Sequence, residues 1–163
     1  MSCIESHVVR AVVSLEESAS CAEAARLMAA HGIGSVGVRR GPKLIGIVTE
    51  RDLLGAVAGG LDPARTAVVR AIPGDLATVS PCASEREAAE QMRLHHTRHL
   101  AVVEGGEIVG VLSLLDLVSM VVEEKQWSID QLESYIRGGR AEQLSAPIRP
   151  VFSHHPVSQL SLS

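Results

Sequence analysis

Two copies of a hydroxyl-x-x-aspartate motif are the residues in this chain best suited to chemistry. The first is Thr49 and Asp52 in GIVTERDLL, and the second is Ser113 and Asp116 in GVLSLLDLV. This spacing caps the first turn of a helix, where unpaired backbone N–H groups and the helix dipole favour a phosphate. A carboxylate only accepts hydrogen bonds, so it suits two adjacent sugar hydroxyls. Each motif is therefore either a helix cap alone or a cap that also binds a nucleotide-like ligand.

The motifs belong to an internal repeat. Residues 12–53 align with residues 76–117 without a gap, and twelve of the 42 aligned pairs are identical. Each copy predicts a strand, a helix, two strands joined by a glycine-bearing turn, and a second helix. The expected strands are 12–15, 35–38 and 44–48, then 76–79, 100–103 and 108–112. Capping boxes at Ser20–Glu23 and Ser84–Glu87 start the first helix of each copy.

The repeat predicts an α/β (α+β) fold of two β-α-β-β-α units packed about a pseudo-twofold axis, because each unit is too small to bury a core alone. We expect an N-terminal segment at 1–11, repeats at 12–60 and 76–122, and a linker with a short helical turn at 61–75. Residues 123–163 predict a C-terminal helix, stopped by Gly138–Gly139, followed by a flexible tail.

The repeated units resemble a pair of cystathionine-β-synthase (CBS) domains, which together form a Bateman module. The resemblance covers about residues 8–122, and GIVTERDL is its most specific piece. It implies a regulatory module that binds AMP, ADP, ATP or S-adenosylmethionine in clefts between the two units, without catalysis and without a required cofactor. The family's central-strand proline is replaced here by Gly37 and Ala101.

The resemblance also implies roles for individual residues, because the family's G-h-x-T/S-x-x-D motif falls on 46–52 and 110–116. The implied contacts are Asp52 and Asp116 with ribose hydroxyls, Thr49 and Ser113 with ribose or phosphate, and Ile47 and Val111 with the base. Each cleft is then completed by the other repeat: Asp52 faces Thr78, Thr97 and Arg98, and Asp116 faces Ser14, Ile33 and Gly34. The only aromatic residues lie at 127, 135 and 152, which fits a base held by aliphatic side chains and backbone.

The two clefts differ in charge. Arg51 and Arg98 lie on the Asp52 side as possible phosphate partners, and Leu115 and Gly34 take their places on the other side. We therefore expect one cleft to bind a phosphorylated nucleoside, and the other to be weak, empty or suited to a less charged ligand.

Composition excludes several other classes of protein. A net charge of −4 argues against nucleic-acid binding, and no apolar run is long enough for a membrane span. The chain start lacks the pattern of a secretory signal, so a cytoplasmic location is expected. Three cysteines without a C-x-x-C pair suggest no disulfide framework. The sequence contains no recognisable nucleophile–base pattern, so we do not expect an enzyme.

Two further interpretations stay open. His31, His95, His96 and His99 allow a metal site, although polar residues at a helix end explain them as well. The clefts can also be vestigial, with both aspartates acting only as caps in a structural or interaction module. The helix after Ser113 is apolar over most of its circumference, which favours a homodimer, and a ligand could regulate an unidentified protein partner.

Overall fold

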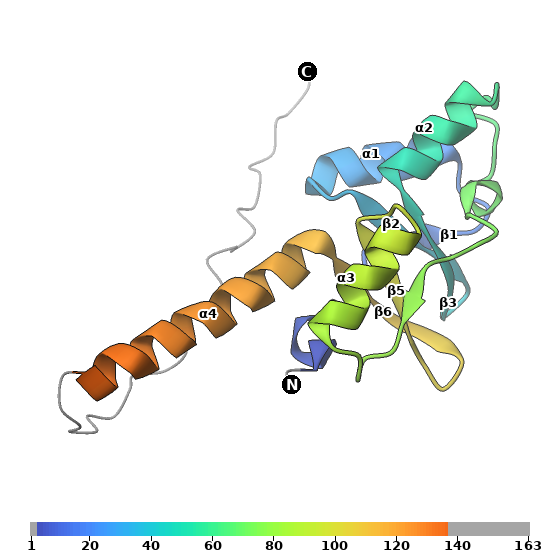
Figure 1. The fold of residues 1–163 in the computed structure, drawn as a ribbon. Helices are drawn as coiled ribbons and strands as arrows, with labels where there is room; N and C mark the ends of the chain where they lie inside the picture. The colour runs from blue at the N-terminus through green and yellow to red at the C-terminus, as the bar shows by residue number, and fades with distance from the viewer. Residues whose placement is uncertain (1–2, 137–163) are drawn as a thin grey trace, which may run out of the picture. The chain divides into compact units, whose positions relative to one another are not determined.

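The computed structural model describes residues 3–136 (Figure 1). The chain divides into two units at Gln126–Trp127. The described part of the second unit, 127–136, is helical. The stop expected at Gly138–Gly139 and the expected tail lie outside the described residues.

Each repeat forms a three-stranded sheet with two helices, as the sequence predicts. The first contains β1 (Ser14–Glu16), α1 (Cys21–His31), β2 (Ser35–Arg40), β3 (Lys43–Thr49) and α2 (Glu50–Ala58). The second contains β4 (Thr78–Val79), α3 (Glu85–Leu94), β5 (His99–Glu104), β6 (Glu107–Ser113) and α4 (Leu114–Ile136). In both sheets the first strand pairs parallel to the middle strand, which pairs antiparallel to the third. The β-α-β-β-α order is confirmed.

Local chemistry sets the helix ends. Ser20 and Ser84 accept hydrogen bonds from the backbone N–H groups of Glu23 and Glu87, whose carboxylates bond back, so both predicted capping boxes are present. Gly32 ends α1 in the left-handed conformation with φ of 61°. His96 takes the same place after α3 with φ of 49°, which is uncommon for a residue other than glycine.

The prediction of a separate helix that begins at residue 123 is wrong. Helix α4 runs without a break from Leu114 to Ile136, because the segment contains neither glycine nor proline to interrupt it. No helix within residues 3–136 is long and apolar enough to cross a bilayer.

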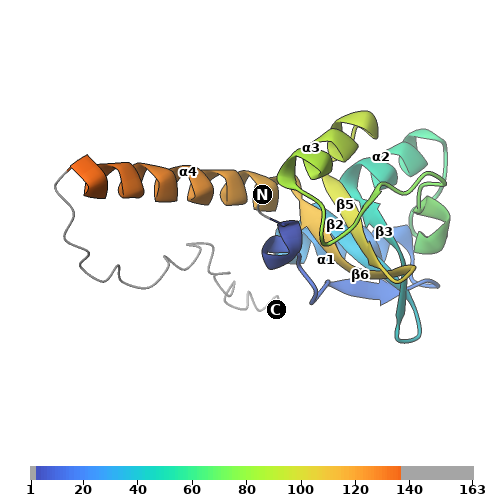
Figure 2. The same ribbon diagram turned by 60° about the horizontal axis from the view of Figure 1, so that its bottom comes forward.

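The two repeats share a core. Each sheet and its helices enclose a cluster of buried aliphatic side chains, and a third cluster joins the sheets through Ile47, Ala101 and Val111. Strand β3 accordingly lies against β5 and β6 (Figure 1, Figure 2). Ile47 and Val111 are equivalent positions of the repeat, so the centre of the module joins the two motifs directly.

Two short 3-10 turns cross between the repeats. The first, η1 (Ile4–His7), places a fully buried Ile4 in the core of the second repeat. The second, η2 (Val68–Ala71), places a fully buried Val68 in the core of the first and is the helical turn expected in the linker. The contacts correspond: Ile4 N donates to Ala83 O at 3.0 Å, and Val68 N donates to Ala19 O at 2.7 Å. The repeat therefore extends upstream of residue 12.

These crossing segments explain the glycine that opens each motif. A Cβ at Gly110 would lie 2.8 Å from the backbone oxygen of Val9 and 2.5 Å from the side chain of Val8. At the equivalent Gly46, a Cβ would lie 2.7 Å from the side chain of Ile72. A side chain at either position would push away the segment that completes the core.

Candidate functional site

The junction of β3 and α2 builds the first candidate site. Thr49 is the N-cap of α2, and its hydroxyl accepts from the backbone N–H of Asp52 at 3.3 Å. The carboxylate of Asp52 accepts from the Thr49 backbone and hydroxyl, both at 2.7 Å and both at Oδ2. The cap therefore makes no use of Oδ1, and capping is compatible with a second, ligand-binding role.

The second motif repeats this geometry. Ser113 N donates to Asp116 Oδ2 at 2.8 Å, the Ser113 hydroxyl donates to the same oxygen, and Asp116 N donates to the hydroxyl at 3.2 Å. Each helix start is also tied to the chain before the middle strand, by Glu50 N to Gly34 O at 3.1 Å and Leu114 N to Arg98 O at 2.8 Å. Both motifs are thus helix caps held at matching places in the fold.

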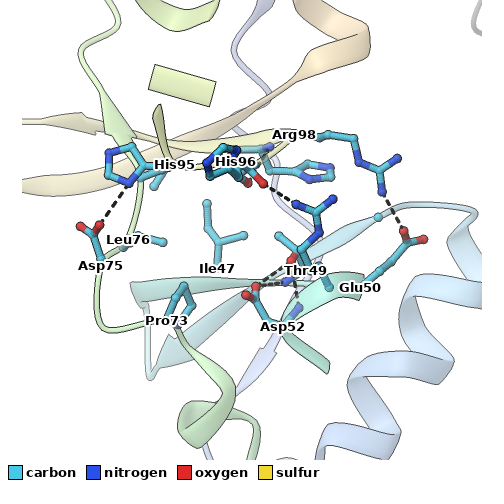
Figure 3. A pocket seen from close by; sticks show the side chains of 16 residues that line it. Ile47, Thr49, Glu50, Asp52, Pro73, Asp75, Leu76, His95, His96 and Arg98 are labelled. Atoms are coloured by element: carbon cyan, nitrogen blue, oxygen red, sulfur yellow. Dashed lines mark hydrogen bonds and ion pairs between the residues drawn. The ribbon is translucent and has the colours of Figure 1, made fainter. Parts of the chain in front are cut away.

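A cavity lies beside the first motif, between the two repeats (Figure 3). Figure 3 shows Thr49, Glu50 and Asp52 on one side and His95, His96 and Arg98 on the other. Lining residues come from both repeats: Gly34, Ile47, Thr49, Glu50, Arg51, Asp52, Pro73, Asp75, Leu76, Ala77, His95, His96, Thr97, Arg98, His99 and Ala101. The lining combines aliphatic side chains with charged ones, a composition that suits a ligand with a flat apolar part and a charged part.

Two arginines close this cavity by reaching across the repeats. Arg51 of the first repeat donates through Nη1 to the backbone oxygen of His96 in the second. Arg98 of the second repeat pairs with Glu50 of the first, with 3.4 Å between Nη2 and Oε2. The free space that remains is about 120 Å³, below the roughly 300–1,000 Å³ typical of small-molecule pockets. A nucleotide would therefore have to displace these exposed arginine side chains.

The cavity brings together six residues that sequence reasoning assigned to the Asp52 cleft: Ile47, Thr49, Arg51, Asp52, Thr97 and Arg98. Thr78 was expected with them, but it is exposed on β4 and does not line the cavity.

The residues assigned to the other cleft are more scattered. Gly34 lines the cavity at Asp52, and Ile33 lines a larger hollow of about 780 Å³ between α1 and α2. The Ser14 hydroxyl accepts from Arg39 Nε at 2.5 Å. Val111 is buried in the shared core, where it contacts the cluster around Ile47. Ser113 and Asp116 line neither hollow.

Sequence reasoning missed several lining residues. Asp75 and His95 face each other with 3.2 Å between Oδ2 and Nδ1, and Glu50 holds Arg98. Asp75 follows a Pro–Gly turn just before the short strand β4, so its place at the cavity depends on a loop that no periodic pattern predicts.

His99 is a titratable residue that lines the cavity. Its ring is half-buried, and a Cβ at Gly34 would lie 3.1 Å from its Cε1. Burial is the main cause that lowers the pKa of His99 below 6.5, and Arg98 adds to this, while Glu50, Asp116 and Asp52 act in the opposite direction. The two motif aspartates therefore favour the protonated form of His99, against the effect of burial.

The lowered pKa of His99 predicts a loss of stability on acidification. As pH falls through 6.5, the unfolded chain takes up a proton before the folded chain does, so the free energy of unfolding decreases. Urea unfolding at about pH 7.5 and about pH 5.5 measures this change. We expect His99→Gln to reduce the pH dependence and the exposed His31→Gln to leave it intact. Equal pH dependence in both variants would contradict the assignment.

The histidine cluster does not gather a metal-ligand set among residues 3–136. Within that range, no three His, Cys, Asp or Glu side chains come together in a way that could hold a metal ion. His95 instead pairs with Asp75, and the backbone of His96 receives Arg51.

Comparison of the sequence with known protein families shows which family the chain belongs to. The model of the CBS domain matches residues 4–59 and again 69–123. The chain belongs to the CBS-domain family. It carries two CBS domains in tandem, and the matches begin at the 3-10 turns that cross between the repeats.

Individual relatives agree with this assignment. The chain is 37% identical over 114 residues to inosine-5'-monophosphate dehydrogenase from Korarchaeum cryptofilum, covering 69% of this chain but only 23% of the dehydrogenase. It is 30% identical to the CBS domain-containing protein YhcV of Bacillus subtilis, covering 72% of this chain and 84% of that protein. A CBS domain protein from Pyrobaculum aerophilum, solved in complex with AMP, is 34% identical with a TM-score of 0.60, over 71% of this chain and 89% of that one.

Proposed function

We propose that this CBS-domain pair is a non-catalytic regulatory module that binds an adenosine-containing ligand in the cavity beside Asp52. The observation that carries the proposal is the helix start at Thr49 and Asp52, which opens onto a cavity completed by Thr97 and Arg98 of the other repeat. The AMP complex of the Pyrobaculum aerophilum relative supports an adenosine ligand.

The lining suggests where each part of the ligand lies. Asp52 accepts from the ribose diol, using the carboxylate oxygen that the cap does not need. Ile47 and Ala101 offer the apolar surface for the base, and both belong to the core cluster that joins the repeats. The N-terminus of α2 and the Thr49 hydroxyl favour the phosphate.

Binding exchanges contacts between the repeats for contacts with the ligand. A phosphate draws Arg51 away from the neutral His96 carbonyl because a guanidinium group prefers a charged, bidentate partner. It also competes with Glu50 for Arg98, because that ion pair is long, at 3.4 Å, and exposed. These contacts link one repeat to the other, so their exchange favours a different arrangement of the two repeats. Such a shift can change the surface offered to a protein partner.

The two motifs differ in this proposal. Leu115 and Gly34 stand at the positions equivalent to Arg51 and Arg98, and Leu115 is 77% exposed on α4. The Asp116 side therefore has no arginine at the two positions that supply Arg51 and Arg98 on the Asp52 side. It binds a phosphorylated ligand weakly, or takes a less charged one.

A thermal-unfolding panel tests the proposal. The chain is heated with AMP, ADP, ATP, S-adenosylmethionine, zinc, or no ligand, and calorimetric titration follows any shift. A ligand at 100 times its dissociation constant adds about 2.7 kcal/mol to the free energy of unfolding. We expect at least one adenosine compound to raise Tm. No response to any of them would favour an interaction module with vestigial clefts, and a response to zinc alone would favour the metal-binding alternative.

We also propose that the module is a homodimer. Apolar side chains stand exposed at equivalent positions of the two repeats: Leu54 and Val57 on α2, and Val118 and Val121 on α4, are between 38% and 69% exposed. The hollow between α1 and α2 beside them is lined mainly by aliphatic side chains. Burying this surface in a second copy removes apolar area from water.

Sedimentation equilibrium measures the assembly. The double variant Leu54→Glu and Val118→Glu places charges on both faces, and we expect it to sediment as a monomer where the unchanged chain forms a dimer. The variant Leu94→Glu, at an exposed position on α3, is the control. A monomeric unchanged chain at high concentration would contradict the proposal.

A further inference from the structure

The N-terminal segment brings Cys3 close to Cys82, far away in the sequence. Cys3 pairs with Ser84 in an isolated antiparallel bridge, and Ile4 N donates to Ala83 O at 3.0 Å. The Cys3 thiol donates to the backbone oxygen of Pro81 at 2.9 Å. Cys3 therefore contacts the chain on both sides of Cys82.

The two thiols influence each other electrostatically. The charge of Cys3 is the main cause that raises the pKa of Cys82, and a polar interaction with the Cys3 side chain adds to it. A disulfide needs its two sulfurs about 2.05 Å apart, and its cysteines must lie on neighbouring stretches of backbone. The bridge between Cys3 and Ser84 and the bond from the Cys3 thiol to Pro81 O bring the backbone at Cys3 beside the backbone around Cys82.

The pair of Cys3 and Cys82 has no counterpart in the first repeat. Cys21, the third cysteine, is 2% exposed in the core of the first repeat. The equivalent crossing in the first repeat pairs Ala67 with Ser20, and Ser18 stands where the second repeat has Cys82. Only the crossing onto the second repeat carries thiols, although the backbone contacts of the two crossings correspond.

We propose that Cys3 and Cys82 form a reversible disulfide that fastens the N-terminal segment to the second repeat. Cys82 is exposed and Cys3 is half-buried, so a small oxidant reaches the pair at Cys82. The redox step does not depend on the ligand proposed for the Asp52 cavity.

The oxidant is a low-molecular-weight disulfide such as oxidised glutathione. The Cys82 thiolate attacks one of its sulfurs, a mixed disulfide forms, and one glutathione thiolate leaves. The Cys3 thiolate then attacks the Cys82 sulfur, the bond to glutathione breaks, and the second glutathione thiolate leaves. The two protein thiols lose two electrons and two protons, and the small disulfide becomes two thiols.

The raised pKa of Cys82 sets the pH dependence of the rate. Cys3, Glu5 and Glu104 all disfavour its thiolate, and the thiolate is the nucleophile. Oxidation is therefore slow near neutral pH and accelerates as pH rises.

The bond would act on a segment that the second repeat needs. Ile4, next to Cys3, is fully buried in the second core, and Val9 pairs with Val111 of β6, with N–O distances of 2.9 Å and 3.0 Å. The cross-link closes a loop of about 80 residues, which restricts the unfolded chain strongly. Oxidation thus stabilises the docked segment along the strand that leads to the second motif.

The experiment uses the full chain in glutathione redox buffers. Remaining thiols are alkylated, and mass spectrometry of the intact chain and of its non-reduced peptides identifies the product. The variants Cys3→Ser and Cys82→Ser each remove one sulfur, and Cys3→Ser keeps a donor for Pro81. Cys21→Ala is the matched control that leaves the pair intact.

We expect one cross-linked peptide pair joining Cys3 to Cys82 in the unchanged chain and in Cys21→Ala, and none in the two serine variants. Tm of the oxidised chain should rise by about 5 °C or more and return on reduction with dithiothreitol. Three results would overturn the proposal: both thiols still open to alkylation, a mixed disulfide that persists on Cys82, or cross-links only between two chains.

Discussion

Replacing Asp52 by alanine should lower the affinity for the adenosine ligand ten- to hundredfold. The variant removes a charge-assisted hydrogen bond to the ribose diol, worth about 1.5–3 kcal/mol. Isothermal titration calorimetry with the ligand that gives the largest thermal shift measures the change. Because Asp52 also caps α2 through Thr49, the variant loses some stability as well, and the titration must be read on folded protein.

The repeat supplies a matched control for this variant. Asp116→Ala removes the equivalent cap hydrogen bonds, those that the Ser113 backbone and hydroxyl donate to its carboxylate at the start of α4, but Asp116 does not line the cavity of Arg51 and Arg98. We expect similar losses of stability in the two variants and a large loss of affinity only in Asp52→Ala. If Asp116→Ala alone abolished binding, the asymmetry drawn from the arginines would be wrong.

Shortening Ile4 to alanine should lower the free energy of unfolding by about 2–5 kcal/mol, the range measured for large aliphatic side chains in protein cores. Ile4 is fully buried in the cluster of the second repeat, among Leu100, Leu112 and Met120. It lies in a short turn near the chain start, where sequence position alone would suggest a mild effect. Urea unfolding monitored by circular dichroism gives the difference.

Two further variants serve as comparisons for Ile4→Ala. Val68→Ala empties the equivalent site in the core of the first repeat, and we expect a comparable loss, reduced by the smaller side chain. Val9→Ala, at a position 46% exposed, should change stability by about 0.5 kcal/mol or less. An effect of Ile4→Ala as small as that of Val9→Ala would show that the turn does not complete the core.

The repeated elements were predictable because local chemistry determines them. Ser20 with Glu23 and Ser84 with Glu87 start helices through bonds within one turn, and Gly32 ends α1 by its own backbone freedom. The gapless alignment then extended each inference from one copy to the other. The family assignment followed from the same motif and is confirmed by the match over both repeats.

The crossing turns were not predictable in this way. Ile4 and Val68 occupy equivalent places, but the segments around them share no identical residue at the repeat offset. Buried packing asks only for an aliphatic side chain of suitable size, so it leaves little trace in a self-alignment. The contact between Cys3 and Cys82 depends on this crossing and was missed for the same reason.

The cavity was predictable in part. Asp52, Thr97 and Arg98 were placed together through the resemblance, and the structure sets all three around one space. The arginine contacts to His96 and Glu50 could not be foreseen, because long side chains choose among partners that only the packed repeats bring within reach. Gly34 lines the cavity for the same reason, since the ring of His99 from the second repeat packs against it.

A crystal structure of the chain with the ligand selected by the panel would show directly whether Asp52 binds the sugar. We expect the ribose diol within hydrogen-bond distance of the Asp52 carboxylate, the phosphate beside the start of α2, and Arg51 released from the carbonyl of His96. A ligand bound outside this cavity, or one bound with the Asp52 carboxylate turned away from its sugar, would contradict this expectation.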